Sequence, residues 1–185
     1  MKRLMIVAVL LWGTGSCLAQ DISGEIQGVY FRIQGFNFNS GVSDFNIESA
    51  AINGGGYAFV YQITEKFGLF QQMGFFGGPE QSGLKIKLIT EFQGMQITKS
   101  RGSVDFYAKG GVGFTRYVFS GLIEGVDANL ALLYGGGVKL PLKEGLKVIL
   151  EGSRITQGLP NLTNAPGRSK WDHSWHFATG IAIQF

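Results

Sequence analysis

The eleven residues Trp175–Phe185, with the sequence WHFATGIAIQF, decide the fold of this chain. Every odd-numbered position among them carries a large or β-branched side chain, and every even-numbered position carries a small or polar one. Successive side chains of a β-strand point to opposite faces, so this alternation predicts a strand with one broad apolar face. A helix would instead repeat its apolar residues every three or four positions.

The same alternation recurs along the rest of the chain. Seven further segments show it, at residues 26–34, 57–63, 67–76, 84–93, 104–115, 129–140 and 147–155. The connections alternate between long and short, with short turns at 64–66, 99–102 and 142–145. An up-and-down barrel with turns at one rim and loops at the other has this order of connections. The sequence therefore predicts an all-β fold, an eight-stranded antiparallel up-and-down barrel.

Two kinds of barrel share this pattern, and they differ in the direction of the apolar face. A soluble lipocalin-like barrel turns that face inward to hold a ligand, whereas a transmembrane β-barrel turns it toward lipid. The polar face of the predicted strands also carries most of their glycines and alanines, which suits a crowded lumen. Its charges nearly balance, as a buried lumen requires. They are Arg32, Lys85, Lys87, Lys109 and Lys139 against Glu91, Asp105, Glu151 and Asp172. These features favour the transmembrane β-barrel; a soluble lipocalin-like barrel binding a small apolar ligand is the alternative.

The composition excludes two other classes of protein. The 185 residues suffice for one domain with a sizeable core. Glycine is abundant, with 29 residues, but proline counts only 4, whereas disordered low-complexity chains usually enrich both. The longest uninterrupted apolar run, Leu4–Trp12, is far shorter than the ~20 residues that a spanning helix needs. A disordered chain and a helical membrane protein are therefore excluded.

The N-terminus follows the plan of a secretory signal peptide. Lys2 and Arg3 precede the apolar run, and the small residues Cys17 and Ala19 suit cleavage after Ala19. We therefore expect a signal peptide at 1–19 and a barrel domain at 20–185. Lipidation of Cys17 is an alternative, although the usual leucine three residues before it is missing. Cleavage after Ala19 leaves 14 Lys and Arg, 13 Asp and Glu and no cysteine, which excludes disulfides and does not support nucleic-acid binding.

Three segments resemble strands of a known family. AKGGVGFTRY, ALLYGGGVKLPL and HFATGIAIQF are similar to middle and last strands of the outer-membrane β-barrel domain family, of the small OmpA/OmpX type. The resemblance covers Asp21 to Phe185. It implies an integral protein of a Gram-negative outer membrane with both termini on the periplasmic side. It also implies a non-enzymatic structural or surface-interaction role carried by the extracellular loops.

The resemblance extends to expected partners. The last strand is similar to the signal read by the outer-membrane assembly machinery, in its terminal Phe185 and the preceding Phe177, Ile181 and Ile183. The expected partners are this machinery, periplasmic chaperones, and outer-membrane lipid including lipopolysaccharide. A monomer is expected, and no nucleic acid.

A charge network is the one concrete site that the strand pattern predicts. If the turn between segments 84–93 and 104–115 centres on Ser100, Glu91 and Lys109 lie directly opposite each other on the lumenal face. We expect a salt bridge between them, joined by Glu151 across the barrel. Eight strands give an interior that side chains just fill, so no open pore is expected.

One group of residues has the composition of a catalytic site. Asp172, Ser174 and His176 share the inward face of the last strand, so an outer-membrane lipid acyl hydrolase is a third possible function. No oxyanion donors can be identified for it, and a lumenal site would not meet a lipid substrate. His173 faces away from His176, so the two cannot chelate a metal together. The sequence therefore predicts no enzyme, no catalytic residue, no cofactor and no metal.

Overall fold

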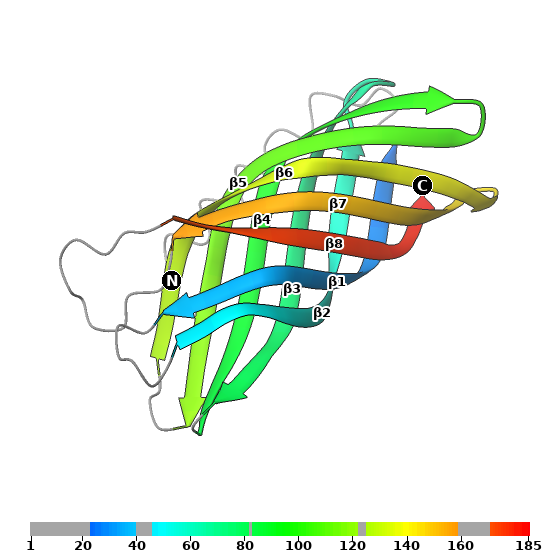
Figure 1. Ribbon diagram of the computed structural model, residues 1–185. Helices are drawn as coiled ribbons and strands as arrows, with labels where there is room; N and C mark the ends of the chain where they lie inside the picture. Colours follow the sequence, from blue (N-terminus) through cyan, green and yellow to red (C-terminus); the bar gives the residue numbers. More distant parts are fainter. Residues whose placement is uncertain (1–22, 40–45, 82, 122–124, 159–170) are drawn as a thin grey trace, which may run out of the picture.

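The computed structural model describes residues 23–39, 46–81, 83–121, 125–158 and 171–185. They form eight β-strands in one closed barrel (Figure 1). The strands are β1 (Gly24–Asn39), β2 (Asn46–Gln62), β3 (Phe67–Gln81), β4 (Leu84–Arg101), β5 (Val104–Gly121), β6 (Gly125–Lys143), β7 (Leu146–Gly158) and β8 (Trp171–Gln184). The predicted all-β, eight-stranded antiparallel barrel is confirmed. The predicted signal peptide, with Cys17 and the cleavage site after Ala19, lies outside the described residues.

Every strand pairs antiparallel with its neighbours in sequence, and β1 pairs with β8 to close the sheet. The short turns at 63–66, 102–103 and 144–145 lie at the same end of the barrel as the C-terminus (Figure 1). We call this the turn end, and the opposite end, where β2, β4, β6 and β8 begin, the loop end. No helix in the described part of the chain is long and apolar enough to cross a membrane.

The strands are strongly staggered around the barrel. A path through directly opposed residues leaves β2 at Tyr61 and returns to β2 at Ala51, ten residues along the strand. It passes through Leu69, Met95, Gly110, Tyr134, Arg154, Trp175 and Gln34. Strands of such a barrel are inclined about 40° to its axis, and eight of them enclose a space just wide enough for side chains. Lumenal residues therefore pack against one another across the barrel.

The outer surface of the turn-end half is almost entirely apolar. We call this surface the outer band. Its large exposed side chains include Ile26, Tyr30, Tyr57, Tyr61, Phe67, Leu69, Met95, Ile97, Phe106, Val112, Tyr134, Leu150, Ile181 and Ile183. A water-soluble barrel would bury such side chains, whereas a membrane barrel presents them to acyl chains.

The loop-end half has the opposite distribution. Its interior is a hydrophobic core, which we call the loop-end core. This core includes Phe31, Ile33, Phe36, Ile52, Phe76, Ile86, Leu88, Phe92, Tyr117 and Phe119. Its outer surface carries exposed cations, among them Arg32, Lys87 and Arg116. The barrel is therefore inside-out near its turns. Near its loops, an apolar interior is combined with an outer surface that carries both cations and exposed apolar side chains such as Phe75 and Leu130.

All eight strands lie where the sequence predicts them, but most extend further toward the loop end. β5 continues to Gly121 instead of ending at Thr115, and β1 continues to Asn39 instead of ending at Gln34. In these extensions the interior becomes apolar, and Tyr117 and Phe119 point inward. The predicted small or polar lumen ends there, because in the loop-end half the inner face of the strands is apolar and the outer face carries charged residues.

The prediction is wrong about the two faces of β4. The sequence predicts that Ile86, Leu88 and Phe92 face lipid, but all three are buried in the barrel, at most 2% exposed. Lys87, predicted to be lumenal, is exposed on the outer surface. Arg32, which is also predicted to be lumenal, is likewise exposed on the outer surface. Residues 84–93 belong to the loop-end half, where the apolar face is the inner one.

Candidate functional site

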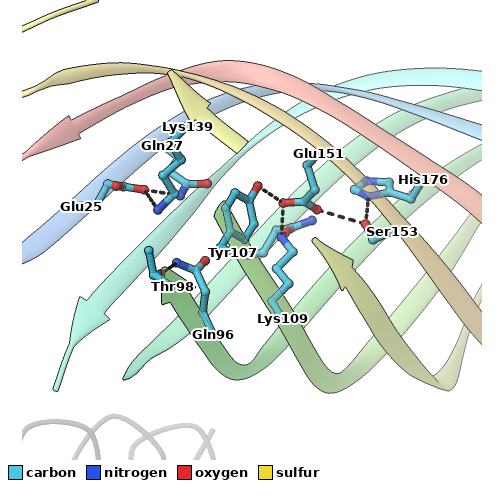
Figure 2. Close-up of polar contacts among 11 residues, drawn as sticks. Glu25, Gln27, Gln96, Thr98, Tyr107, Lys109, Lys139, Glu151, Ser153 and His176 are labelled. Carbon is cyan, nitrogen blue, oxygen red and sulfur yellow. Dashed lines mark hydrogen bonds and ion pairs between the residues drawn. The ribbon is translucent and has the colours of Figure 1, made fainter. Parts of the chain in front are cut away.

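A charge network fills the lumen of the turn-end half, drawn in Figure 2. Lys109 Nζ lies 2.7 Å from Glu151 Oε2, and both side chains are only 3% exposed. Tyr107 donates a hydrogen bond of 2.7 Å to the same carboxylate, and Ser153 Oγ donates one of 3.0 Å to its other oxygen. Lys109 also donates to Gln72 Oε1 at 2.5 Å. Three strands, β3, β5 and β7, are thereby tied together across the barrel.

Two further ion pairs lie closer to the turns. Lys139 Nζ lies 2.7 Å from Glu25 Oε1, again with both side chains almost fully buried. Gln27 donates a second hydrogen bond to Glu25. Lys147 Nζ and Asp105 Oδ2 are 2.5 Å apart and slightly more exposed. Each buried lysine among the described residues therefore has a carboxylate partner, which offsets the cost of removing both charges from water.

Aromatic rings connect the ion pairs to one another. Lys139 Nζ lies 5.1 Å from the centre of the Tyr107 ring, and Lys109 Nζ lies 5.1 Å from that of Phe70. Lumenal glycines make room for these rings. A Cβ atom at Gly137 would lie 2.2 Å from the Leu150 carbonyl oxygen and 2.9 Å from the Tyr107 hydroxyl, so this position has no room for a side chain. Ion pairs and aromatic rings thus pack together and fill the lumen of the turn-end half.

The structure brings together two of the three residues of the predicted network. Lys109 and Glu151 form the central ion pair, but Glu91 is not part of it, and its predicted pairing with Lys109 is wrong. The residue opposite Lys109 is Gln96. The turn between β4 and β5 is formed by Gly102 and Ser103 instead of being centred on Ser100, because Gly102 adopts a positive φ of 62°. This odd shift in register moves every β4 side chain to the other face.

Glu91 lies on the outer surface. It is opposite Phe114 in the sheet and forms an ion pair with Arg116, with 3.5 Å between Glu91 Oε2 and Arg116 Nη2. The two side chains are 30% and 49% exposed.

Most partners in the network could not be predicted from the sequence. Glu25 precedes the predicted strand at 26–34, and Tyr107 and Gln72 carry no charge at neutral pH that would mark them. Lys139 is correctly predicted to be lumenal, but its partner lies 114 residues away in sequence. Pairing across the lumen depends on stagger, which alternation along a single strand does not reveal.

The proposed catalytic group has no catalytic geometry. His176 Nδ1 lies 3.1 Å from Ser153 Oγ, while Ser174 Oγ and His176 Nε2 have no hydrogen-bond partner among the described residues. The His176 ring packs 4.7 Å from the Phe31 ring, and both Ser174 and His176 are at most 1% exposed. A substrate could not reach either side chain without opening the loop-end core.

No cluster of three metal-ligating side chains occurs in the described ranges. A cavity of about 450 Å³ lies at the turn end and is lined partly by Ser100, Asp105 and Lys147. Ser100 donates a hydrogen bond of 2.6 Å to Asp105, which also pairs with Lys147. Asp105 and Lys147 of this cavity are thus already engaged with each other.

Comparison with known proteins gives a likeness in structure only. No family model matches the sequence, and no curated protein matches it. Neisserial surface protein A superposes with a TM-score of 0.66 at 11% identity, covering 89% of this chain and 97% of that one. OprG from Pseudomonas aeruginosa gives 0.58 at 14% identity, covering 90% and 97%. Ail of Yersinia pestis, in complex with the heparin analogue sucrose octasulfate, gives 0.57 at 13% identity, covering 90% and 100%.

The chain is a small eight-stranded barrel of the outer-membrane type. At these identities the likeness concerns the fold, and it agrees with the apolar outer band and the polar lumen of the turn-end half.

Proposed function

We propose that this protein is an integral barrel of a Gram-negative outer membrane, without enzymatic activity, whose role is structural or lies in interactions at the cell surface. The turn-end half would sit in the bilayer with the turns and both termini in the periplasm. The loop-end half would stand above the outer leaflet and present the extracellular connections on a rigid base.

The exchange of the inner and outer faces carries this proposal. A strand needs ~9–11 residues to cross a bilayer, whereas these strands have 13 to 19. The extra residues lie on the loop-end side, where the core is apolar and exposed charges such as Arg116 and Lys87 face outward. Such a surface suits water and lipid headgroups, and the outer band suits acyl chains.

The same distribution counts against a lipocalin-like ligand carrier. A ligand cavity for an apolar molecule would occupy the barrel interior, but the turn-end interior holds ion pairs and the loop-end interior holds closely packed rings. Phe36 and Tyr117, for example, have ring centres 6.0 Å apart and are fully buried. The third function, lipid acyl hydrolysis, predicts that Ser174→Ala abolishes ester turnover. We expect Ser174→Ala to leave the lipid A of the cell unchanged.

Membrane insertion is tested by placing a charge at the middle of the outer band. Leu150→Arg puts a guanidinium among apolar neighbours on β7 and is expected to lower the free energy of unfolding by about 2–4 kcal/mol in lipid vesicles. Val126→Arg is the matched control, because Val126 is 68% exposed at the loop end of β6. It is expected to cost less than ~1 kcal/mol. Equal losses for the two variants would contradict the proposed membrane position.

The exposed residues of the barrel support two proposed binding partners, of which the first is lipopolysaccharide. The exposed outward cations Arg32, Arg116 and Lys87 lie at or beyond the loop-side margin of the outer band, at the depth where phosphate groups of lipopolysaccharide are expected. Charge reversal at Arg32 and Arg116 should reduce the lipopolysaccharide that copurifies with the barrel. Unchanged copurification would refute this contact.

The second partner is the assembly machinery. Phe177, Ile181, Ile183 and Phe185 all lie exposed on the outer face of β8 and beyond its end, available to another protein before insertion. Deletion of Phe185 should slow insertion into the membrane in cells while leaving refolding into detergent unaffected. Normal insertion of the deletion variant would refute this role.

A further inference from the structure

Two arginines face outward on the wall formed by β7, β8 and β1, which lie side by side (Figure 1). Arg154 on β7 lies directly opposite Trp175 on β8, and Arg32 on β1 lies directly opposite Phe177 on β8. Trp175 and Phe177 are neighbours on the outer face of β8. The two arginines therefore flank this aromatic pair from either side.

The two arginines lie at nearly the same height along the barrel axis. A path through opposed residues climbs ten residues toward the loop end over eight strands, and 10/8 is about one and a quarter residues for each strand. From Arg154 this path crosses β8 and reaches β1 at Gln34, and Arg32 lies two residues back toward the turn end. The climb and the step back nearly cancel. Two strand spacings and two residues place the Cα atoms of the two arginines about 10–12 Å apart.

The aromatic pair between the arginines is a flat and exposed surface. The rings of Trp175 and Phe177 are stacked, with 6.4 Å between their centres and 19° between their planes, and both side chains are exposed. Arg154 Cζ lies 5.8 Å from the centre of the Trp175 ring. This cation–π contact holds the guanidinium beside the ring, and the group still has N–H donors to offer to an anion.

Neither arginine forms an ion pair with a carboxylate among the described residues. Two outward cations of the opposite wall differ in this respect, because Arg116 pairs with Glu91 at 3.5 Å and Lys85 pairs with Glu80 at 3.3 Å. The wall of β7, β8 and β1 thus carries two uncompensated positive charges at the loop-side margin of the outer band. Arginine binds phosphate through two parallel hydrogen bonds, so these charges suit phosphate groups at headgroup depth.

The spacing of the four side chains indicates the chemistry of the ligand. Two cations with an aromatic surface between them are complementary to two anionic groups joined by a unit with an apolar face. A disaccharide with a phosphate at each end has this form, because the C–H groups of its sugar rings can pack on aromatic rings while the phosphates reach the arginines. A phospholipid headgroup with a single phosphate would engage only one of the two arginines.

We propose that Arg154, Trp175, Phe177 and Arg32 bind one molecule of lipopolysaccharide, with the bisphosphorylated disaccharide of its lipid A lying across the aromatic pair. The inference rests on the membrane position proposed above. It deepens the proposed lipopolysaccharide contact, because it assigns one bound molecule to one wall of the barrel. The acyl chains of this molecule would extend along the outer band toward the turn end.

Binding of lipid A to the purified chain, folded in detergent, tests the site. Native mass spectrometry counts the lipid molecules on each barrel and is expected to show one tightly bound bisphosphorylated lipid A. Arg32→Gln with Arg154→Gln should weaken this binding by about tenfold or more, since charge-assisted hydrogen bonds are lost at both ends of the ligand. Lys99→Gln with Arg101→Gln is the matched control. It removes two exposed positive charges at the turn end and should leave the binding unchanged.

Two further measurements identify the ligand chemistry. Monophosphorylated lipid A should bind to the native chain about tenfold more weakly than the bisphosphorylated form, and phosphatidylglycerol at equal concentration should not displace the latter. Trp175→Leu should weaken binding several-fold, because leucine keeps the surface apolar but removes the flat ring. Heat-modifiable gel migration shows that each variant is folded.

Several results would overturn the proposed site. They are unchanged binding in the arginine variant, an equal loss in the control variant, equal binding of the two forms of lipid A, and displacement by phosphatidylglycerol. Failure of the chain to fractionate with the outer membrane would instead refute the proposed function. Because binding is measured on the purified chain, the two failures are distinguishable.

Discussion

Replacement of Glu151 by alanine is expected to lower the free energy of unfolding of the barrel by about 3–5 kcal/mol. The reason is the charge left behind. Lys109 is 3% exposed and would lose its carboxylate partner, and Tyr107 and Ser153 would lose the acceptor of their hydrogen bonds. Urea unfolding in lipid vesicles, followed by tryptophan fluorescence, measures the loss.

Two controls show whether burial is the cause. Glu80 forms an ion pair of 3.3 Å with Lys85, and both side chains are more than half exposed. Glu80→Ala is therefore expected to cost less than ~1 kcal/mol. Replacing both Lys109 and Glu151 by methionine removes the charges together and is expected to recover most of the loss. A Glu151→Ala variant no less stable than Glu80→Ala would contradict the charge network described above.

The second large effect is expected in the loop-end core. Phe92→Ala should destabilise the barrel by about 3–5 kcal/mol, because Phe92 is fully buried and its removal leaves a cavity. Phe114→Ala on the adjacent strand is the control. Phe114 points outward from the wall and is 49% exposed, so lipid replaces the lost contacts and the loss should be clearly smaller. A larger loss for Phe114→Ala would reverse the assignment of the two faces on β4 and β5.

The strands and their connectivity could be predicted from the sequence because alternation is a local property. Trp175–Phe185 shows it without interruption, and the structure places its odd-numbered residues on the outer surface as predicted. The glycine runs at 54–56 and 135–137 lie within β2 and β6. A Cβ atom at Gly56 would lie 2.0 Å from the Met73 carbonyl oxygen and 2.7 Å from the Phe31 ring, which is why this inward position carries no side chain.

The orientation of β4 could not be predicted in the same way. Alternation shows that a strand has two unlike faces, but which face is inner depends on the surroundings of each half of the barrel. Charge is predicted to be lumenal on every strand, but residues 84–93 lie in the loop-end half, where the inner face is apolar. The turn signal that sets the register is a single residue, Gly102.

Only part of the charge network could be predicted from the sequence. Lys109 and Glu151 follow from the inward positions of their strands, whereas Glu25 and Lys139 meet through the stagger of the closed barrel. Alternation reveals which residues face the lumen. It does not reveal at what height each of them lies, so partners on distant strands stay hidden until the register is known.

The central claim is that the membrane ends where the two faces of the barrel exchange character. Spin labels on cysteines at four outward positions of β5, Ala108, Val112, Val118 and Ser120, test it directly in a chain with Cys17→Ser. In lipid vesicles, the labels at 108 and 112 are expected to be accessible to oxygen and shielded from a water-soluble nickel chelate. Those at 118 and 120 are expected to be accessible to the chelate. Chelate access at all four positions would show that the outer band faces water, and shielding at all four would show that the loop-end half lies in the bilayer; either result would contradict the account.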